Sequence, residues 1–238
     1  KSITLDGSGT FASILASLVN GIIINAAATD VVTIRGISIN GFCNGINGIN
    51  ILQAKTVNVE DCVIFRFNTG NGITVNETND LNLNVRNTVI RDNTLDAINT
   101  FTSGAANKVN VTLEHVSLIG SANGIHARAG SRVTARNSVF SNNTTNGVFS
   151  DAVAGGTLSN VFVWDSQISM NGQNGVRAGN AGNAGVSGAT VNQNMIDRNG
   201  GNGVLVSTGG VVNTFTNNSI LGNGTDGCPG CTSVGPGN

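Results

Sequence analysis

A short phrase, Asn-Gly-Ile or Asn-Gly-Val, returns along nearly the whole chain at steps of 23 to 28 residues. A fixed period in this range indicates stacked repeats, because one such unit cannot bury a core alone and needs its neighbours. Asp96-Ala97-Ile98 stands where one copy is due. The other copies begin at Asn20, Asn47, Asn71, Asn123, Asn146, Asn174 and Asn202. The repeat therefore predicts a solenoid in place of a compact globule.

Two further segments keep register with this phrase. One alternates apolar and polar residues, as in Val57–Glu60 and Leu83–Arg86, and the next carries a large apolar residue such as Ile64 or Ile90. Alternation with a period of two is typical of a strand with one buried face. The sequence thus predicts an all-β, single-domain right-handed parallel β-helix over residues 1–225, with about nine coils and three strands per coil. Residues 226–238 are predicted to form a C-terminal tail.

Composition supports many short strands joined by tight turns. Only 11% of residues are charged, Tyr is absent, and both prolines lie in the last ten positions. The net charge of -1 gives no general attraction to nucleic acid, and no apolar run approaches the ~20 residues of a membrane span. Two histidines at unrelated positions do not have the spacing of a zinc site. We therefore predict no nucleic-acid partner, no membrane span, no metal and no cofactor.

Polar residues form columns when the coils are aligned. The Asn of each repeat is expected to bond its copies in the coils above and below, as a ladder. A second column after the second strand is expected to form turns, with His115 as a ladder member and not a ligand: Asp61, Asn87, His115, Asn137, Asp165, Asn194 and Asn217. Outward charges alternate in sign through Asp6, Arg35, Glu60, Arg86, Glu114 and Arg136. Each exposed pair is worth only ~0 to 1 kcal/mol, so we interpret this column as register control.

The cysteines do not make a disulfide framework. Cys43 and Cys62 occupy different positions of successive coils and are predicted to stay unpaired. The Cys228-Pro-Gly-Cys231 loop is not followed by a predicted helix that would suit a redox motif. We therefore predict a small disulfide between Cys228 and Cys231, which suits an oxidising compartment.

The repeats resemble secreted right-handed parallel β-helix proteins related to pectate lyases, in particular bacterial proteins built of Asn-Gly-Ile coils. The opening segment, residues 1–9, looks like a phrase that in such proteins follows an N-terminal cap and a first coil. The resemblance implies a secreted or cell-surface location. It also leads us to expect a processed or truncated chain whose uncapped N-terminal coil is open to self-association. It implies the fold strongly and an activity only weakly, since this fold hosts lyases, hydrolases, epimerases, adhesins and spacers.

Motifs of known β-helix enzymes are not found. The polygalacturonase set of Asn-Thr-Asp, Asp-Asp, Gly-His-Gly and Arg-Ile-Lys does not occur, and no acidic cluster suited to calcium is visible. The acidic residues on or beside the first strand, Glu77, Asp96 and Asp151, lie several coils apart or within a turn ladder. The sequence therefore predicts no carboxylate pair for glycoside hydrolysis.

One patch on the first strand is a candidate glycan-binding site. Its six residues are expected to project outward from neighbouring coils: Asn99, Phe101, His126, Arg128, Phe149 and Arg177. The loops 102–108, 152–160 and 178–189 are expected to wall a groove on the same side. Arg side chains can fork onto carboxylates of an acidic polysaccharide, and His126 or Arg128 could accept a proton.

Three functions stay open at this point. The leading hypothesis is a secreted or cell-surface protein that binds polysaccharide, with lyase-like activity as an open extension. The alternative is a non-enzymatic rod of the structural or adhesin type, which would not need His126, Arg128 and Arg177. Ice binding is suggested by the column of Thr4, Thr33, Asn58, Asn84, Thr112 and Thr134. The adjacent column of full charges argues against it.

Overall fold

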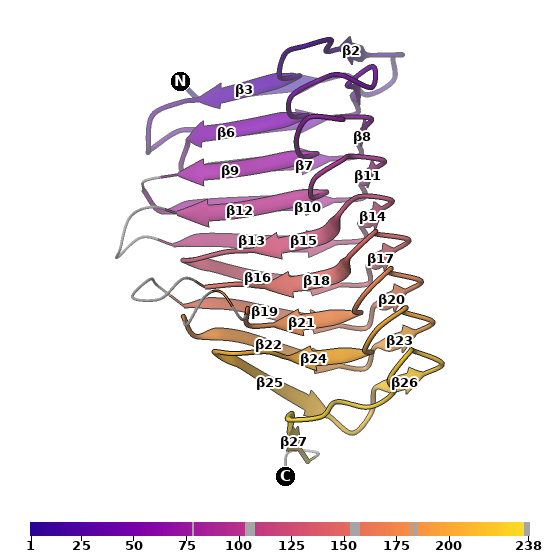
Figure 1. The fold of residues 1–238 in the computed structure, drawn as a ribbon. Coiled ribbons are helices and arrows are strands. Elements are labelled where there is room, and N and C mark those ends of the chain that lie inside the picture. The colour runs from indigo at the N-terminus through magenta and orange to yellow at the C-terminus, as the bar shows by residue number, and fades with distance from the viewer. Residues whose placement is uncertain (78, 103–107, 153–157, 181, 183–184, 236–238) are drawn as a thin grey trace.

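The computed structural model describes residues 1–238 except 78, 103–107, 153–157, 181, 183–184 and 236–238. Within the described residues all regular structure is β-strand, and the strands form three parallel sheets of ten, nine and eight members. Each strand pairs with the strand one turn earlier and one turn later, so the chain winds as a solenoid (Figure 1). The all-β parallel solenoid predicted from the repeat is confirmed. No helix among these residues is long and apolar enough to cross a membrane.

The ten-stranded sheet contains β1 (Ile3–Asp6), β4 (Val31–Arg35), β7 (Thr56–Glu60), β10 (Leu81–Arg86), β13 (Val109–Glu114), β16 (Ser131–Arg136), β19 (Ser159–Trp164), β22 (Ser187–Asn192), β25 (Gly210–Phe215) and β27 (Thr232–Val234). The nine-stranded sheet contains β2 (Ser13–Leu15), β5 (Ser38–Asn40), β8 (Val63–Phe65), β11 (Val89–Arg91), β14 (Ser117–Ile119), β17 (Val139–Ser141), β20 (Gln167–Ser169), β23 (Met195–Asp197) and β26 (Ser219–Leu221). The eight-stranded sheet contains β3 (Ile22–Asn25), β6 (Ile49–Gln53), β9 (Ile73–Glu77), β12 (Ile98–Thr102), β15 (Asn123–Ala127), β18 (Asn146–Ser150), β21 (Val176–Ala178) and β24 (Val204–Val206).

The solenoid has about eight turns, against the nine coils expected from the sequence. One strand of each sheet makes up a turn, and the complete turns run from β3 to β26. Strands β1 and β2 precede them, and β27 follows. β27 lies within the segment predicted to be a tail and pairs in parallel with β25. Cys228 and Cys231 are joined by a disulfide just before β27, while Cys43 and Cys62 are free.

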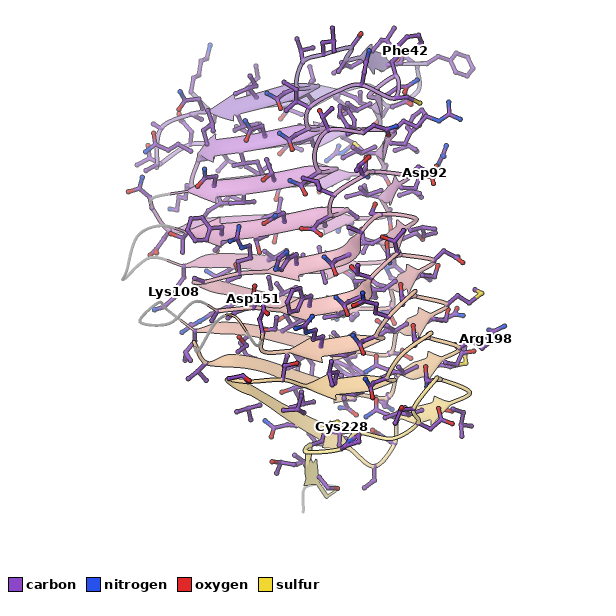
Figure 2. The ribbon with its side chains drawn as sticks, viewed as in Figure 1. Phe42, Asp92, Lys108, Asp151, Arg198 and Cys228 are labelled. Carbon is purple, nitrogen blue, oxygen red and sulfur yellow. A yellow bond between two sulfur atoms is a disulfide. The ribbon has the colours of Figure 1, made fainter. Side chains whose placement is uncertain are left out.

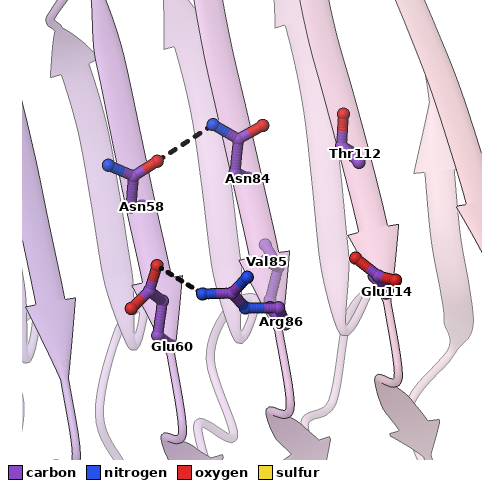
Figure 3. A pocket seen from close by; sticks show the side chains of 7 residues that line it. All are labelled: Asn58, Glu60, Asn84, Val85, Arg86, Thr112 and Glu114. Atoms are coloured by element: carbon purple, nitrogen blue, oxygen red, sulfur yellow. Dashed lines mark hydrogen bonds and ion pairs between the residues drawn. The ribbon is translucent and has the colours of Figure 1, made fainter.

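The charged column on the ten-stranded sheet is in register as predicted. Arg35 lies opposite Asp6 and Glu60 on the two neighbouring strands, and its guanidinium is 2.8 Å from the Glu60 carboxylate. Glu60 also pairs with Arg86 at 3.2 Å, as Figure 3 shows beside the bond between Asn58 and Asn84. A slip by one residue would bring apolar inward positions to the surface, so these pairs favour the observed register.

The interior holds the inward residues of all three sheets in one core. Ile49, Val57 and Ile64, one from each sheet in the same turn, are fully buried. On strand β1, Ile3 is 59% exposed and Leu5 is 43% exposed. Their neighbours in the next turn, Val32 and Ile34, are buried.

The Asn ladder at the repeat links the side chains of neighbouring turns except between Asn71 and Asp96, where the Asp96 backbone N–H donates to Asn71 Oδ1. Asn146 donates from Nδ2 to Asn123 Oδ1 at 2.8 Å, and Asn174 donates in the same way to Asn146 at 2.8 Å. Corresponding bonds link Asn47 to Asn20, Asn71 to Asn47, Asn123 to Asp96 and Asn202 to Asn174. The ladder therefore satisfies amide groups that the turn would otherwise leave unpaired.

A further ladder, which the sequence analysis missed, follows the third strand inside the core. Asn143, Asn171 and Asn199 are buried and pass side-chain bonds from turn to turn, at 2.9 Å between Asn143 and Asn171 and 2.8 Å between Asn171 and Asn199. Each Nδ2 also donates to a strand carbonyl, such as that of Phe140 for Asn171. The same column contains Asn93, Ser121 and Asn223.

The predicted turn column after the second strand needs correction in the last two turns. Five members adopt left-handed backbone conformations: Asp61, Asn87, His115, Asn137 and Asp165. His115 has φ 53° and its side chain is exposed, as expected of a turn residue. Asn217, in the last turn, does not adopt this conformation. In the next-to-last turn, however, the left-handed residue is Gln193 (φ 54°) and not Asn194. Asn194 points inward, is 2% exposed, and accepts a bond from the Ser166 backbone. The pattern was read one residue too far because Asn is the more common turn residue.

Candidate functional site

The outward column on the eight-stranded sheet is the predicted one. His126 on β15 lies opposite Asn99 on β12 and Phe149 on β18, and Phe149 lies opposite Arg177 on β21. Leu205 on β24 continues the column. Parallel in-register pairing places such side chains side by side on one face, so four successive turns contribute to one cluster.

His126 lies between two carboxylates that the sequence analysis treated as separate. Its Nδ1 is 3.1 Å from Asp96 Oδ2, and its Nε2 is 3.5 Å from Asp151 Oδ2. The second contact is longer than an ordinary hydrogen bond, and Nε2 is buried without a well-directed hydrogen-bond partner among the described residues. Both carboxylate side chains are only 7% exposed and the imidazole is 17% exposed. Figure 2 labels Asp151, which directly follows β18.

The Asn ladder explains how Asp96 reaches this position. Asp96 occupies the ladder position of its turn, and its Oδ1 accepts a 2.7 Å bond from Asn123 as an Asn oxygen would. Its second oxygen has no amide hydrogens and accepts from Asn99 at 3.2 Å while contacting His126. The single break in the Asn-Gly repeat therefore supplies the carboxylate that holds the histidine. The replacement of Asn by Asp96 in the repeat was the feature of the sequence from which the contact between Asp96 and His126 could have been predicted.

The charge state of His126 follows from these contacts. Burial acts to lower the pKa of His126, but the two adjacent carboxylates, Asp151 and Asp96, outweigh it, and the pKa is raised above its ordinary value. The imidazolium form of His126 therefore persists to higher pH in the folded protein than in a free histidine. This charge state opposes the role of proton acceptor that was considered from the sequence.

The ring of Phe149 lies between the His126 imidazole and the Arg177 guanidinium. Its ring stacks on the imidazole of His126 with centroids 4.6 Å apart, and the Arg177 guanidinium lies 4.8 Å from the ring centroid. Because β15 and β21 flank β18 on opposite sides, these groups cover Phe149 from both sides, and it is 7% exposed. A sugar ring could therefore stack on Phe149 only if one of these neighbours moved.

The two arginines hold their guanidinium groups over aromatic rings. Arg128 lies 5.3 Å from the Phe101 centroid, and Arg177 also donates from Nε to the Gly179 carbonyl at 3.2 Å. Within the described ranges neither arginine forms an ion pair. Cation–π contacts orient a guanidinium while leaving N–H groups for other partners. Asn99, Phe101, His126, Arg128, Phe149 and Arg177 thus lie on one face, as predicted.

Some expectations lie outside the described residues. Three loops were expected to wall a groove. Their positions 103–107, 153–157, 181 and 183–184 lie outside the residues that the structure describes. Asn180, within the third loop, donates to Asp151 Oδ2 at 3.4 Å. Among the residues that the structure describes, no group of three or more His, Cys, Asp or Glu residues has the arrangement of a metal site.

A family model described as the right-handed β-helix region matches residues 104–233, more than half of the chain. The chain belongs to the right-handed β-helix family. The handedness expected from the sequence resemblance agrees with this match. This β-helix protein has no match among curated proteins.

A solved structure shows the same architecture. The crystal structure of pectate lyase Pel9A aligns to 88% of this β-helix protein with a TM-score of 0.58 and 12% identity. The alignment spans 62% of the pectate lyase chain. At this identity the likeness shows a shared fold and not a shared activity.

Proposed function

We propose that this β-helix protein binds extended acidic polysaccharide along the outer face of the eight-stranded sheet. The observation that carries the proposal is the cluster around His126, defined here as the His126 cluster: Asp96, His126, Arg128, Phe149, Asp151 and Arg177. Three groups in it are cationic when His126 is protonated, and two of them are guanidinium groups outside any described ion pair.

Charge and geometry both suit a polyuronate. Arg128 and Arg177 come from different turns, so their two guanidinium groups follow one another along the long axis of the solenoid. Guanidinium groups bind carboxylates through paired charge-assisted hydrogen bonds. Asp96 and Asp151 are buried, and both carboxylates face His126. A polymer with one carboxylate per sugar would meet these cations in succession.

The cluster favours binding over elimination chemistry near neutral pH. A lyase needs a neutral base to remove a proton next to the uronate carboxylate. The pKa of His126 is raised by the neighbouring carboxylates, which disfavours the neutral imidazole that would act as this base. Lyase-like activity is therefore a secondary proposal, and it would increase as the pH rises through the His126 pKa.

The proposal includes an exported location. Support comes from the disulfide between Cys228 and Cys231, since such bonds persist in oxidising compartments. The exposed apolar side chains of Ile3 and Leu5 on β1 support a second contact, self-association through that strand. Light scattering across a range of protein concentrations tests it, and a monomer at every concentration would contradict it.

The test measures binding of polygalacturonate by isothermal titration calorimetry, with absorbance of unsaturated products read in the same samples. Arg177→Ala and Arg128→Ala should each weaken binding by roughly tenfold, since charge-assisted hydrogen bonds contribute about 1.5 to 3 kcal/mol. Arg198→Ala removes an equal charge from an exposed turn and serves as the matched control. Unchanged affinity in both cluster variants would refute the site. If wild-type protein binds no glycan, the structural rod becomes the better account.

A further inference from the structure

The outer face of the ten-stranded sheet changes character at β19. From β1 to β16 one outward column consists of alternating charges, and Trp164 then lies opposite Arg136 where an acidic residue would continue the pattern. Trp164 is the single tryptophan of the chain and is 41% exposed. Its indole N–H donates to Gln193 Oε1, so the polar group is satisfied and the exposed part is the aromatic ring.

A second aromatic residue extends this surface. Phe162 precedes Trp164 by two positions and is half-buried on the same outward face. Residues two apart on a strand are about 6.6 Å apart, so the two rings form one apolar strip along β19. Asn160, two positions further back, is exposed and completes the outward side of the strand. The strip therefore has an amide at one end.

Shallow hollows lie on both sides of β19. The hollow toward β22 and β25 has a volume of about 250 Å³ and exists because Gly188, opposite Asn160, has no side chain. A Cβ at Gly188 would lie 2.7 Å from Asn160 Oδ1. The hollow toward β16 lies beside Arg132, Thr134 and Phe162. Polar groups border the first hollow at Asn160, Thr190 and Asn213.

The charge of this surface is positive and comes from Arg132. Arg132 is exposed and faces Asn110 and Asn160 on the adjacent strands. It forms no ion pair with any residue that the structure describes. Neither hollow has an Asp or Glu in its lining. The surface would therefore attract an anion and leave a bound carboxylate without a competing acid.

We propose that this surface, defined as the Trp164 face (Arg132, Asn160, Phe162, Trp164, Gly188 and Thr190), is a second carbohydrate-binding surface for acidic glycans. The C–H face of a sugar ring is apolar and matches Phe162 and Trp164, while its hydroxyl groups match the amides and the Thr190 hydroxyl. Arg132 matches a uronate carboxylate. The surface belongs to a different sheet from the His126 cluster, so the two can be occupied and disrupted separately.

The test uses fluorescence of the single tryptophan during titration with a galacturonate hexamer, with cellohexaose as the neutral comparison. We expect a saturable change in emission with the acidic probe and a weaker response to the neutral one. Arg132→Ala should weaken the response by roughly tenfold, and Gly188→Leu should abolish it by filling the hollow. Circular dichroism checks the fold of Gly188→Leu. Arg132→Glu reverses this exposed charge and leaves the hollow at Gly188 unaltered, and it should also weaken the response.

Controls separate this proposal from that of the His126 cluster. Arg177→Ala should leave the fluorescence titration unchanged while it weakens the calorimetric signal. Calorimetric binding without any emission change would overturn the Trp164 face and leave the His126 cluster standing. An emission change that follows protein concentration without glycan would also overturn it, because it would identify a second copy of the chain as the occupant.

Discussion

Asp96 Oδ2 lies 3.1 Å from His126 Nδ1 although 30 residues separate them in the chain. The contact joins two successive turns and uses the one ladder position where Asn is replaced by a carboxylate. Ladder and candidate site therefore share a residue. The substitution costs the ladder an amide donor and gives His126 a buried negative partner.

We expect Asp96→Asn to restore the regular ladder and to lower the pKa of His126. The amide would still accept from Asn123, but it would no longer stabilise the imidazolium by charge. NMR titration of the histidine side-chain signals measures this, and His115 provides an internal reference. Asp92→Asn, which removes an exposed carboxylate paired with Arg91, should leave the His126 titration unchanged. An equal shift in both variants would contradict the assigned contact.

His126 should make stability depend on pH. Its pKa is raised in the folded state, so the stabilisation is fully present below the unfolded value of about 6.5 and is lost as pH rises through the folded pKa. The difference in unfolding free energy between wild type and His126→Gln should therefore be largest under acidic conditions and shrink toward alkaline pH. Urea denaturation at a series of pH values measures it. A difference that grows with pH would show that His126 is held neutral.

The buried Asn ladder of Asn143, Asn171 and Asn199 should contribute more stability than an exposed bond between two asparagine side chains on neighbouring strands. Asn171 is 1% exposed and bonds Asn143, Asn199 and the Phe140 carbonyl. Asn171→Ala removes these buried side-chain bonds and takes the acceptor from the Asn143 backbone N–H, so we expect a loss of about 2 to 4 kcal/mol in unfolding free energy. Asn110→Ala removes an exposed bond to Asn82 and should cost less than about 0.5 kcal/mol. Similar losses in the two variants would contradict the role of burial.

The third-strand residue that packs against the repeat Gly position explains why Ala97 is accepted there. Ala97 and Leu118 are predicted to compensate each other. At Gly72 and Gly147 an added Cβ would meet Cγ2 of the Ile in the third strand of the same turn, at 2.2 Å for Ile90 and 2.6 Å for Ile168. The turn that contains Ala97 has Leu118 at the corresponding place, and Leu has no Cγ2 branch on its Cβ.

Leu118→Ile should therefore destabilise the protein by about 1 to 3 kcal/mol through overpacking. Adding Ala97→Gly should recover part of this loss, because it removes the Cβ that the Ile branch meets. Thermal unfolding of the two single variants and the double variant gives the coupling between the positions. Strict additivity would rule out this explanation for Ala97.

The repeat predicted the solenoid, the strand columns and the outer Asn ladder, because each depends on periodic residues that meet their own copies. Asp96, His126 and Asp151 escaped prediction as a group because they come from three different turns and occupy different positions within them. The inner ladder of Asn143, Asn171 and Asn199 was also missed. Its amides lie just after strands, where the sequence looks like an ordinary polar turn, and only burial distinguishes them.

The ladders connect each turn only to its immediate neighbours, which makes the length of the solenoid adjustable. A duplicated turn inserted after β6 would lengthen the rod and preserve every bond type described above. The same insertion between β12 and β18 would move Asp96 or Asp151 away from His126 by one rung, about 4.8 Å. The molecule thus combines an extensible frame with one segment of three turns in which neither addition nor deletion is tolerated.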